Sequence, residues 1–139
     1  IDWLDRAFPE PRLIPEDAMP RAVALAQAQV VASDIHPLNN LRVLKYLTRD
    51  LGLNEQTKDR WIATWIAQGF EALEAMAGDG IYLGGNTPSI ADCCLVPQMY
   101  NARRFEVPLD DYPRLVAIDA ACLELEAFQN AHPDAVKPA

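Results

Sequence analysis

Apolar residues recur along this chain with the spacing of an α-helix. The clearest stretch extends from about Asn54 to Met76, where hydrophobic side chains return every third or fourth position: Trp61, Ile62, Trp65, Ile66, Phe70 and Leu73. This spacing puts them on one face of a helix, which would pack against the rest of the protein. The alternation typical of a β-strand is absent from the sequence. The pattern therefore predicts an all-α fold.

The same periodicity predicts four further helical stretches. They cover residues 1–8, about 20–52, 89 to 104 or 105, and 112–125. Pro37 interrupts the second stretch, because its ring clashes with the carbonyl of Ser33 and it lacks a backbone donor. We expect one long kinked helix there rather than two helices. In the last stretch Leu115, Ile118, Cys122 and Leu125 should face inward. The tail from His132 should be loosely held.

Prolines mark a boundary near the start of the chain. Four of them, Pro9, Pro11, Pro15 and Pro20, lie within twelve positions, which excludes a regular helix and predicts a stiff extended linker. A linker so close to the first residue implies a domain on its far side. The predicted organisation is the end of a preceding domain over residues 1–8, a linker over 9–19 and a helical domain over 20–139. The chain has no initiator Met, so we expect an upstream portion.

Composition and charge narrow the classes of function. The chain carries 20 acidic and 12 basic residues, giving a formal net charge of −8, which argues against nonspecific binding to nucleic acid. Cysteines occur at positions 93, 94 and 122 and form no metal-binding or redox pattern. Free thiols are typical of a reducing cytoplasm, where we expect the protein to act. No membrane-spanning stretch or signal peptide is visible.

Ser89-Ile90-Ala91-Asp92 has the form of a helix capping box, with Asp in place of the commoner Glu or Gln. The hydroxyl should accept from the N–H of the third helical residue. The carboxylate should accept from the N–H of the cap residue and complement the helix dipole. The box opens the most apolar helix of the chain, which should be buried. A buried helix end must leave no donor unsatisfied, so the cap should matter for stability.

Two pairs of polar residues are candidates for binding. His36 and Asn40 are four residues apart and share a helix face beside the Pro37 kink. They either bind a ligand or satisfy backbone groups that the kink frees. Arg103 and Arg104 end the helix that the capping box begins. They either interact with the helix dipole or hold a carboxylate with the planar guanidinium group. The residues alone leave both alternatives open.

Three segments of the chain resemble glutathione transferases. Gly85-Asn-Thr-Pro-Ser-Ile-Ala-Asp92 resembles the folding motif of their second domain. Asp34-Ile-His-Pro-Leu-Asn-Asn-Leu-Arg-Val-Leu-Lys-Tyr-Leu47 and Arg103-Arg-Phe-Glu-Val-Pro-Leu-Asp110, followed by Tyr112-Pro113, resemble the zeta group, which includes maleylacetoacetate and maleylpyruvate isomerases. The likeness runs from residue 1 to about residue 130. It implies the helical bundle of a glutathione transferase C-terminal domain, without the thioredoxin-like domain whose last helix would end at residues 1–8.

The resemblance implies a glutathione-dependent cis–trans isomerase of aromatic catabolism that acts on maleylacetoacetate or maleylpyruvate, as a cytoplasmic homodimer. Glutathione binding would fall on His36 and Asn40, with Arg42 a weaker candidate. The thiol-activating loop would belong to the thioredoxin-like domain, so the chain alone should be inactive. No catalytic residue and no metal ligand is expected within it.

For the substrate, the resemblance assigns one carboxylate to Arg104, with Arg103 as the second choice. Tyr100, one turn earlier, could edge the substrate pocket. The capping residues Ser89 and Asp92 are assigned a structural role. Nothing in the sequence separates maleylacetoacetate from maleylpyruvate as substrate.

Two alternatives stay open beside the isomerase. One is a general transferase that conjugates glutathione to electrophiles, and the other is a non-catalytic helical module used for docking. The sequence upstream of this chain would distinguish the enzyme from the docking module. A thioredoxin-like region with a Ser or Cys in its first loop favours the enzyme, and a different region favours the docking module.

Overall fold

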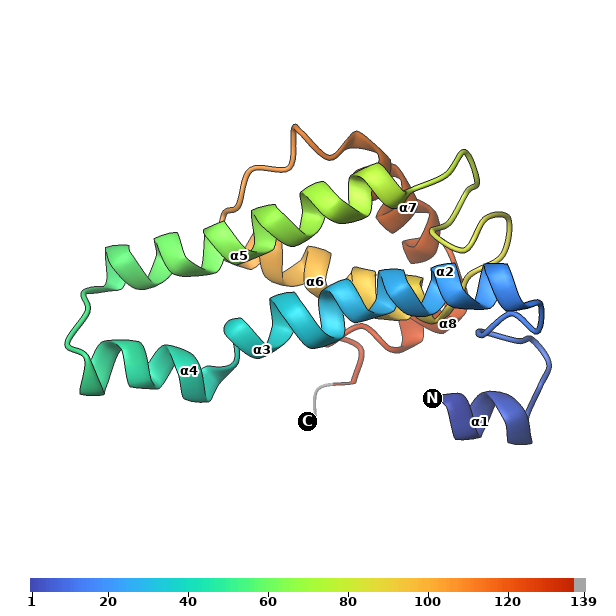
Figure 1. Ribbon diagram of the computed structural model, residues 1–139, viewed down its shortest axis with the longest axis horizontal. Coiled ribbons are helices and arrows are strands. Elements are labelled where there is room, and N and C mark those ends of the chain that lie inside the picture. Colours follow the sequence, from blue (N-terminus) through green and yellow to red (C-terminus); the bar gives the residue numbers. More distant parts are fainter. Residues whose placement is uncertain (137–139) are drawn as a thin grey trace.

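A computed structural model describes residues 1–136, and within them the chain is a bundle of helices without a β-strand. The all-α prediction is confirmed. The elements are α1 (Asp2–Ala7), α2 (Ala18–Gln29), the π-helical η1 (Val30–Ile35), α3 (His36–Leu38), α4 (Leu41–Lys45), the π-helical η2 (Tyr46–Asp50), α5 (Glu55–Met76), α6 (Ile90–Arg104), α7 (Pro113–Leu123) and α8 (Glu126–Asn130). Figure 1 shows α4, η2 and the start of α5 extending together at the end of the bundle farthest from α7.

Helix α5 forms where the periodicity predicts it. The Asn54 side chain caps its start by accepting from the Thr57 N–H at 2.9 Å. The predicted apolar face lies in the core, and its fully buried members are Ile62, Ile66, Phe70 and Leu73. Trp61 is only partly buried and packs against this core, and its indole N–H donates to the Leu38 carbonyl at 3.0 Å.

The stretch between α2 and α5 breaks at a different place from the one expected. The chain stays helical through Pro37, because the wider π-helical turn of η1 precedes it and the His36 N–H reaches back to Val31. The break falls at Asn40, whose backbone is extended with ψ of 142°. Its side chain accepts from the Arg42 N–H at 3.1 Å and caps a new helix. The prediction of one kinked helix is therefore wrong, since two helical segments form.

The predicted capping box begins α6 inside the core. The Asp92 carboxylate accepts from the Ser89 N–H at 2.8 Å, from the Ser89 hydroxyl at 2.9 Å and from the Leu83 N–H at 2.8 Å. The Ser89 hydroxyl accepts from the backbone N–H of Asp92, the third helical residue, as expected, and also from the Ala91 N–H at 3.2 Å. Asp92 is completely buried. The box thus starts α6 and also fastens the preceding loop to it.

The segment before α2 folds back onto α1. The buried Asp5 carboxylate accepts from the N–H groups of Leu13 and Ile14, and Arg12 pairs with it at 3.3 Å. The Leu13 carbonyl in turn accepts from the Ile90 N–H at 2.8 Å, at the start of α6. Residues 8–17 form no helix, in agreement with a proline-rich linker. The division into domains at this point stays a prediction.

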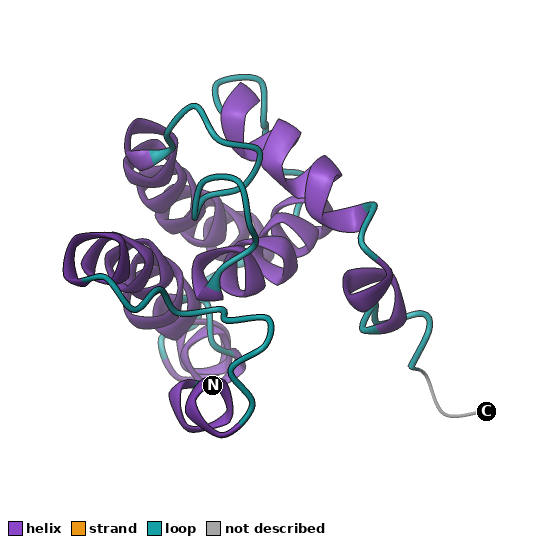
Figure 2. Cartoon of the chain, turned by 90° about the vertical axis from the view of Figure 1, so that its right-hand side faces the viewer, coloured by secondary structure: helices purple, strands orange, loops and turns teal. Residues whose placement is uncertain are grey.

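Helix α6 occupies the centre of the bundle and packs against α2 and α7. Leu115, Ile118 and Cys122 of α7 are buried as predicted. Leu125 lies beyond α7, which ends at Leu123, and is the cap residue before the unpredicted helix α8. Figure 2 shows the C-terminal part of the chain standing beside the bundle. No helix among the described residues is both long and apolar enough to cross a membrane.

Candidate functional site

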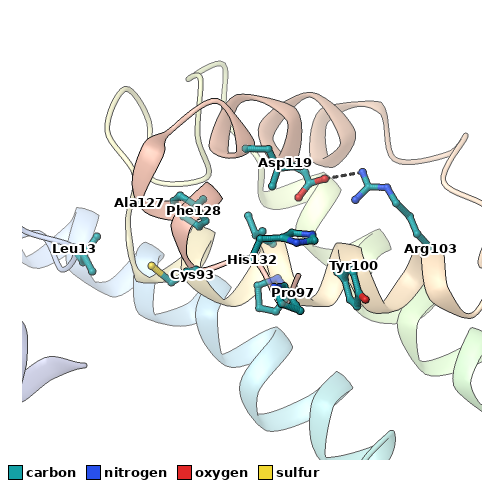
Figure 3. A pocket seen from close by; sticks show the side chains of 13 residues that line it. Leu13, Cys93, Pro97, Tyr100, Arg103, Asp119, Ala127, Phe128 and His132 are labelled. Carbon is teal, nitrogen blue, oxygen red and sulfur yellow. Dashed lines mark ion pairs between the residues drawn. The ribbon is translucent and has the colours of Figure 1, made fainter. Parts of the chain in front are cut away.

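A largely apolar pocket lies between α6 and the segment that follows α7 (Figure 3). Its volume is about 690 Å³, which is within the range of small-molecule sites. The lining side chains come from the linker, from one face of α6, from α7, and from α8 and the turn after it. They are Leu13, Cys93, Val96, Pro97, Tyr100, Arg103, Asp119, Leu123, Ala127, Phe128, Ala131, His132 and Pro133.

An ion pair between Arg103 and Asp119 crosses this pocket (Figure 3). The Arg103 Nη2 atom lies 2.6 Å from Asp119 Oδ2, but this oxygen receives no well-aligned hydrogen bond, so the contact is a charge pair. The Asp119 side chain is 1% exposed and that of Arg103 is 47% exposed. Burial raises the pKa of Asp119, and Arg103 counters this only in part. The guanidinium of Arg103 is therefore engaged within the protein.

Tyr100 and His132 form the other polar edge of the pocket. Their rings meet edge to face with centroids 5.8 Å apart. The prediction that Tyr100 edges the substrate pocket stays a prediction, although Tyr100 lines this cavity. His132 showed no signal in the sequence, because its partner lies more than thirty residues away. The contact joins the turn after α8 to α6.

Arg104 is not among the residues that line the pocket, whereas Arg103 is. Its guanidinium lies over the Phe105 ring, with Cζ 5.5 Å from the ring centroid. Arg104 is exposed and forms no ion pair with any carboxylate of residues 1–136. The structure thus separates two arginines that are adjacent in sequence. Arg103 is paired, and Arg104 has a guanidinium available for an anion.

The residues predicted to bind glutathione lie around the helix break, away from the pocket. His36 is exposed in α3, and Arg42 is exposed in α4 without an ion pair in the described part of the chain. Asn40 is half-buried, and its Oδ1 atom is used as the cap of α4. Beside it, Asn39 Oδ1 is buried without a hydrogen-bond partner. The structure brings these three predicted residues together at one break but does not test their role.

The three cysteines are free, in agreement with the sequence. Burial raises the pKa of Cys93 and Cys94, and burial with nearby Asp92 raises that of Cys122 to about 12. These thiols stay protonated at neutral pH and are poor nucleophiles. Among the described residues no cluster of His, Cys, Asp or Glu has the composition of a metal site.

Known proteins share much of this sequence. Residues 55–118 match a family described as glutathione S-transferase, C-terminal domain. A maleylpyruvate isomerase of Ralstonia sp. is 48% identical over 139 residues, which cover 97% of this chain and 66% of that protein. A probable maleylacetoacetate isomerase of Vibrio cholerae is 46% identical, and 63% of its length is covered. The chain therefore spans slightly less than two thirds of the length of these curated relatives.

Solved structures share the fold closely. Maleylpyruvate isomerase from Pseudomonas aeruginosa PAO1 has a TM-score of 0.93 and 49% identity, with 99% of this chain and 72% of that one covered. A holo maleylpyruvate isomerase, described as a bacterial glutathione S-transferase of the zeta class, has a TM-score of 0.95 and 47% identity, covering 99% and 66%. Maleylacetoacetate isomerase from Anaeromyxobacter dehalogenans 2CP-1, with dicarboxyethyl glutathione and citrate in its active site, has a TM-score of 0.92 and 42% identity, covering 99% and 61%.

Proposed function

This chain belongs to the zeta class of the glutathione S-transferase family, and we propose that it is the C-terminal part of a glutathione-dependent cis–trans isomerase of maleylpyruvate or maleylacetoacetate. Glutathione, when bound, supplies a thiol that adds reversibly to the cis double bond and so permits rotation about it. The relatives named for these two substrates support the proposal, as does the relative that holds dicarboxyethyl glutathione and citrate.

The observation that carries the proposal is the unpaired guanidinium of Arg104. The substrates are small acids, and a planar guanidinium binds a carboxylate through two parallel hydrogen bonds. Arg103 is held by Asp119, whereas Arg104 has no carboxylate partner within residues 1–136. Arg104 is thus a cation that an anionic ligand can reach without displacing an internal partner. We assign the carboxylate contact to Arg104 and keep Arg103, which lines the neighbouring pocket, as the second choice.

The residues at the helix break fit glutathione, which carries carboxylates and amides. Arg42 offers an unpaired cation, His36 offers exposed ring nitrogens, and Asn40 keeps its amide N–H donors. The orphaned Asn39 Oδ1 marks a buried acceptor in the same place. These side chains would orient glutathione, while none of them has to move a proton.

Replacing Arg104 tests the proposal. In the full-length enzyme, Arg104→Ala is expected to lower kcat/KM for maleylpyruvate and maleylacetoacetate about tenfold or more, equivalent to about 1.4 kcal/mol or more. Arg104→Lys should recover only part of this loss, because a point charge lacks the two-pronged geometry. Arg60→Ala, which removes an exposed arginine of α5, is the matched control and should leave kcat/KM unchanged. An unaltered kcat/KM in Arg104→Ala would remove Arg104 from the site.

We further propose that a thioredoxin-like domain precedes this chain and carries the thiol-activating residue, in a cytoplasmic homodimer. The coverage of the relatives supports the missing portion, since about a third of their length is unmatched. The free, protonated cysteines agree with a reducing compartment. Sequencing the upstream region and assaying the complete protein with both maleyl compounds and a halogenated electrophile tests this. Turnover of the electrophile alone would identify a general transferase instead.

A further inference from the structure

The last turn of α6, which carries Arg104, is closed by a Schellman motif. The Val107 N–H donates to the Ala102 carbonyl at 2.9 Å, and the Glu106 N–H donates to the Arg103 carbonyl at 3.1 Å. Glu106 adopts the left-handed conformation that this motif requires, with φ of 54°. Both Val107 and Ala102 are buried and anchor the turn in the core. The backbone at the end of the helix is therefore fixed on both sides.

Phe105 occupies the cap position of this motif, and its side chain is also held. Its N–H donates to the Asn101 carbonyl at 3.0 Å. Its ring is half-buried and packs against the hydrophobic core. Because the backbone of Phe105 and one side of its ring are held in place, the other side of the ring is a fixed surface.

The exposed Arg104 side chain lies over this ring. Its Cζ atom is 5.5 Å from the centroid of the Phe105 ring, within the range of a cation–π interaction. No carboxylate of the described residues competes for the guanidinium. A long unpaired arginine otherwise samples many rotamers, and binding an anion requires that this freedom be lost. Contact with the Phe105 ring removes part of this conformational freedom before the ligand binds.

We propose that Phe105 is a positioning residue, which holds the Arg104 guanidinium ready for the substrate carboxylate. This inference rests on the proposed function and adds a residue to it. The ring does not touch the substrate carboxylate itself. It acts through Arg104, so its effect should appear in substrate binding and should depend on the presence of that arginine.

The test compares Phe105→Leu with Phe105→Tyr in the full-length enzyme with maleylpyruvate and maleylacetoacetate as substrates. Leu keeps apolar volume and removes the ring, whereas Tyr keeps the ring. For Phe105→Leu we expect kcat/KM to fall about two- to fivefold, mainly through a higher KM, because a cation–π contact at an exposed site is weak. Phe105→Tyr should stay near the wild type.

Two further measurements separate positioning from a general loss of structure. Conjugation of glutathione to an uncharged halogenated electrophile needs no carboxylate contact, and Phe105→Leu should leave its rate unchanged. In the Arg104→Ala background, Phe105→Leu should produce no further fall in kcat/KM. Equal losses in the Leu and Tyr variants, or an additive loss beside Arg104→Ala, would overturn the inference. A wild type that turns over neither maleyl compound would instead overturn the proposed function, before any variant is compared.

Discussion

Asp92 shows how much one residue determines in this fold. Its completely buried carboxylate accepts from two backbone N–H groups and one hydroxyl, which belong to the α6 cap and to the loop before it. Each of these donors would be unsatisfied without it, since Leu83 and Ser89 are both buried. Buried donors that lose a partner cost about 1–3 kcal/mol each. Asp92 therefore connects the loop to the helix and also caps the helix.

Asp92→Ala is expected to lower the free energy of unfolding by about 3 kcal/mol or more, because it removes a cap and leaves buried donors without partners. Urea unfolding followed by tryptophan fluorescence measures the change. Asp110→Ala, at an exposed aspartate of the same chain, is the matched control and should be near neutral. A stability within about 0.5 kcal/mol of the wild type would show that the network contributes little.

Glu106 is the only residue other than glycine that has a positive φ among the described residues. A side chain in the left-handed region clashes with its own backbone, and glycine avoids this clash. Glu106→Gly is therefore expected to raise the free energy of unfolding by about 0.5–1 kcal/mol. Glu106→Ala keeps the clash and serves as the control. The explanation fails if the Gly variant is no more stable than the Ala variant in thermal or urea unfolding.

At the scale of elements, local sequence patterns predict where single helices begin, but not where consecutive helices are interrupted. Asn54 and Ser89 cap α5 and α6 near the positions where the sequence predicts each helix to begin. The sequence predicts the interruption at Pro37, because a proline disturbs the helical hydrogen bonds, whereas the structure breaks at Asn40. The π-helical turn of η1 accommodates the proline, and a π-helical turn leaves no distinct pattern of residues.

The contact between α6 and α7 includes the pair of Arg103 with buried Asp119. Burial raises the pKa of Asp119 above its ordinary 3.8, so the folded protein binds this proton more readily than the unfolded chain. Stability from this group therefore falls as pH rises from 3.8 through the raised pKa. At neutral pH the ionised, buried Asp119 carboxylate lowers the stability of the fold, and the half-exposed Arg103 offsets this only in part.

Asp119→Asn removes this ionisation, and Arg103 keeps water as a partner because it is 47% exposed. We expect the variant to be more stable than the wild type at pH 7, by up to about 1 kcal/mol. The difference should shrink as the pH falls toward 3.8, where Asp119 becomes protonated. Urea unfolding at several pH values measures it. A marked loss of stability at pH 7 would instead show that the ion pair is strongly stabilising.

At the scale of the whole molecule, large apolar side chains are exposed at the N-terminal helix α1, just before the linker. Trp3 of α1 is 73% exposed, and Phe8, directly after this helix, is 69% exposed. Contiguous exposed apolar surface marks a site of interaction. These exposed side chains suit contact with the upstream domain that we propose.

The sequence by itself determined the helical class, the start of α5 and α6, and the family, because periodicity and caps depend on residues within a few positions of one another. It also placed both arginines at the end of α6. Only the tertiary structure decided which of them is free. Arg103 meets the carboxylate of Asp119 from another helix, sixteen positions away, and Arg104 lies on the ring of Phe105. Such a choice depends on how helices pack, and no local pattern records it.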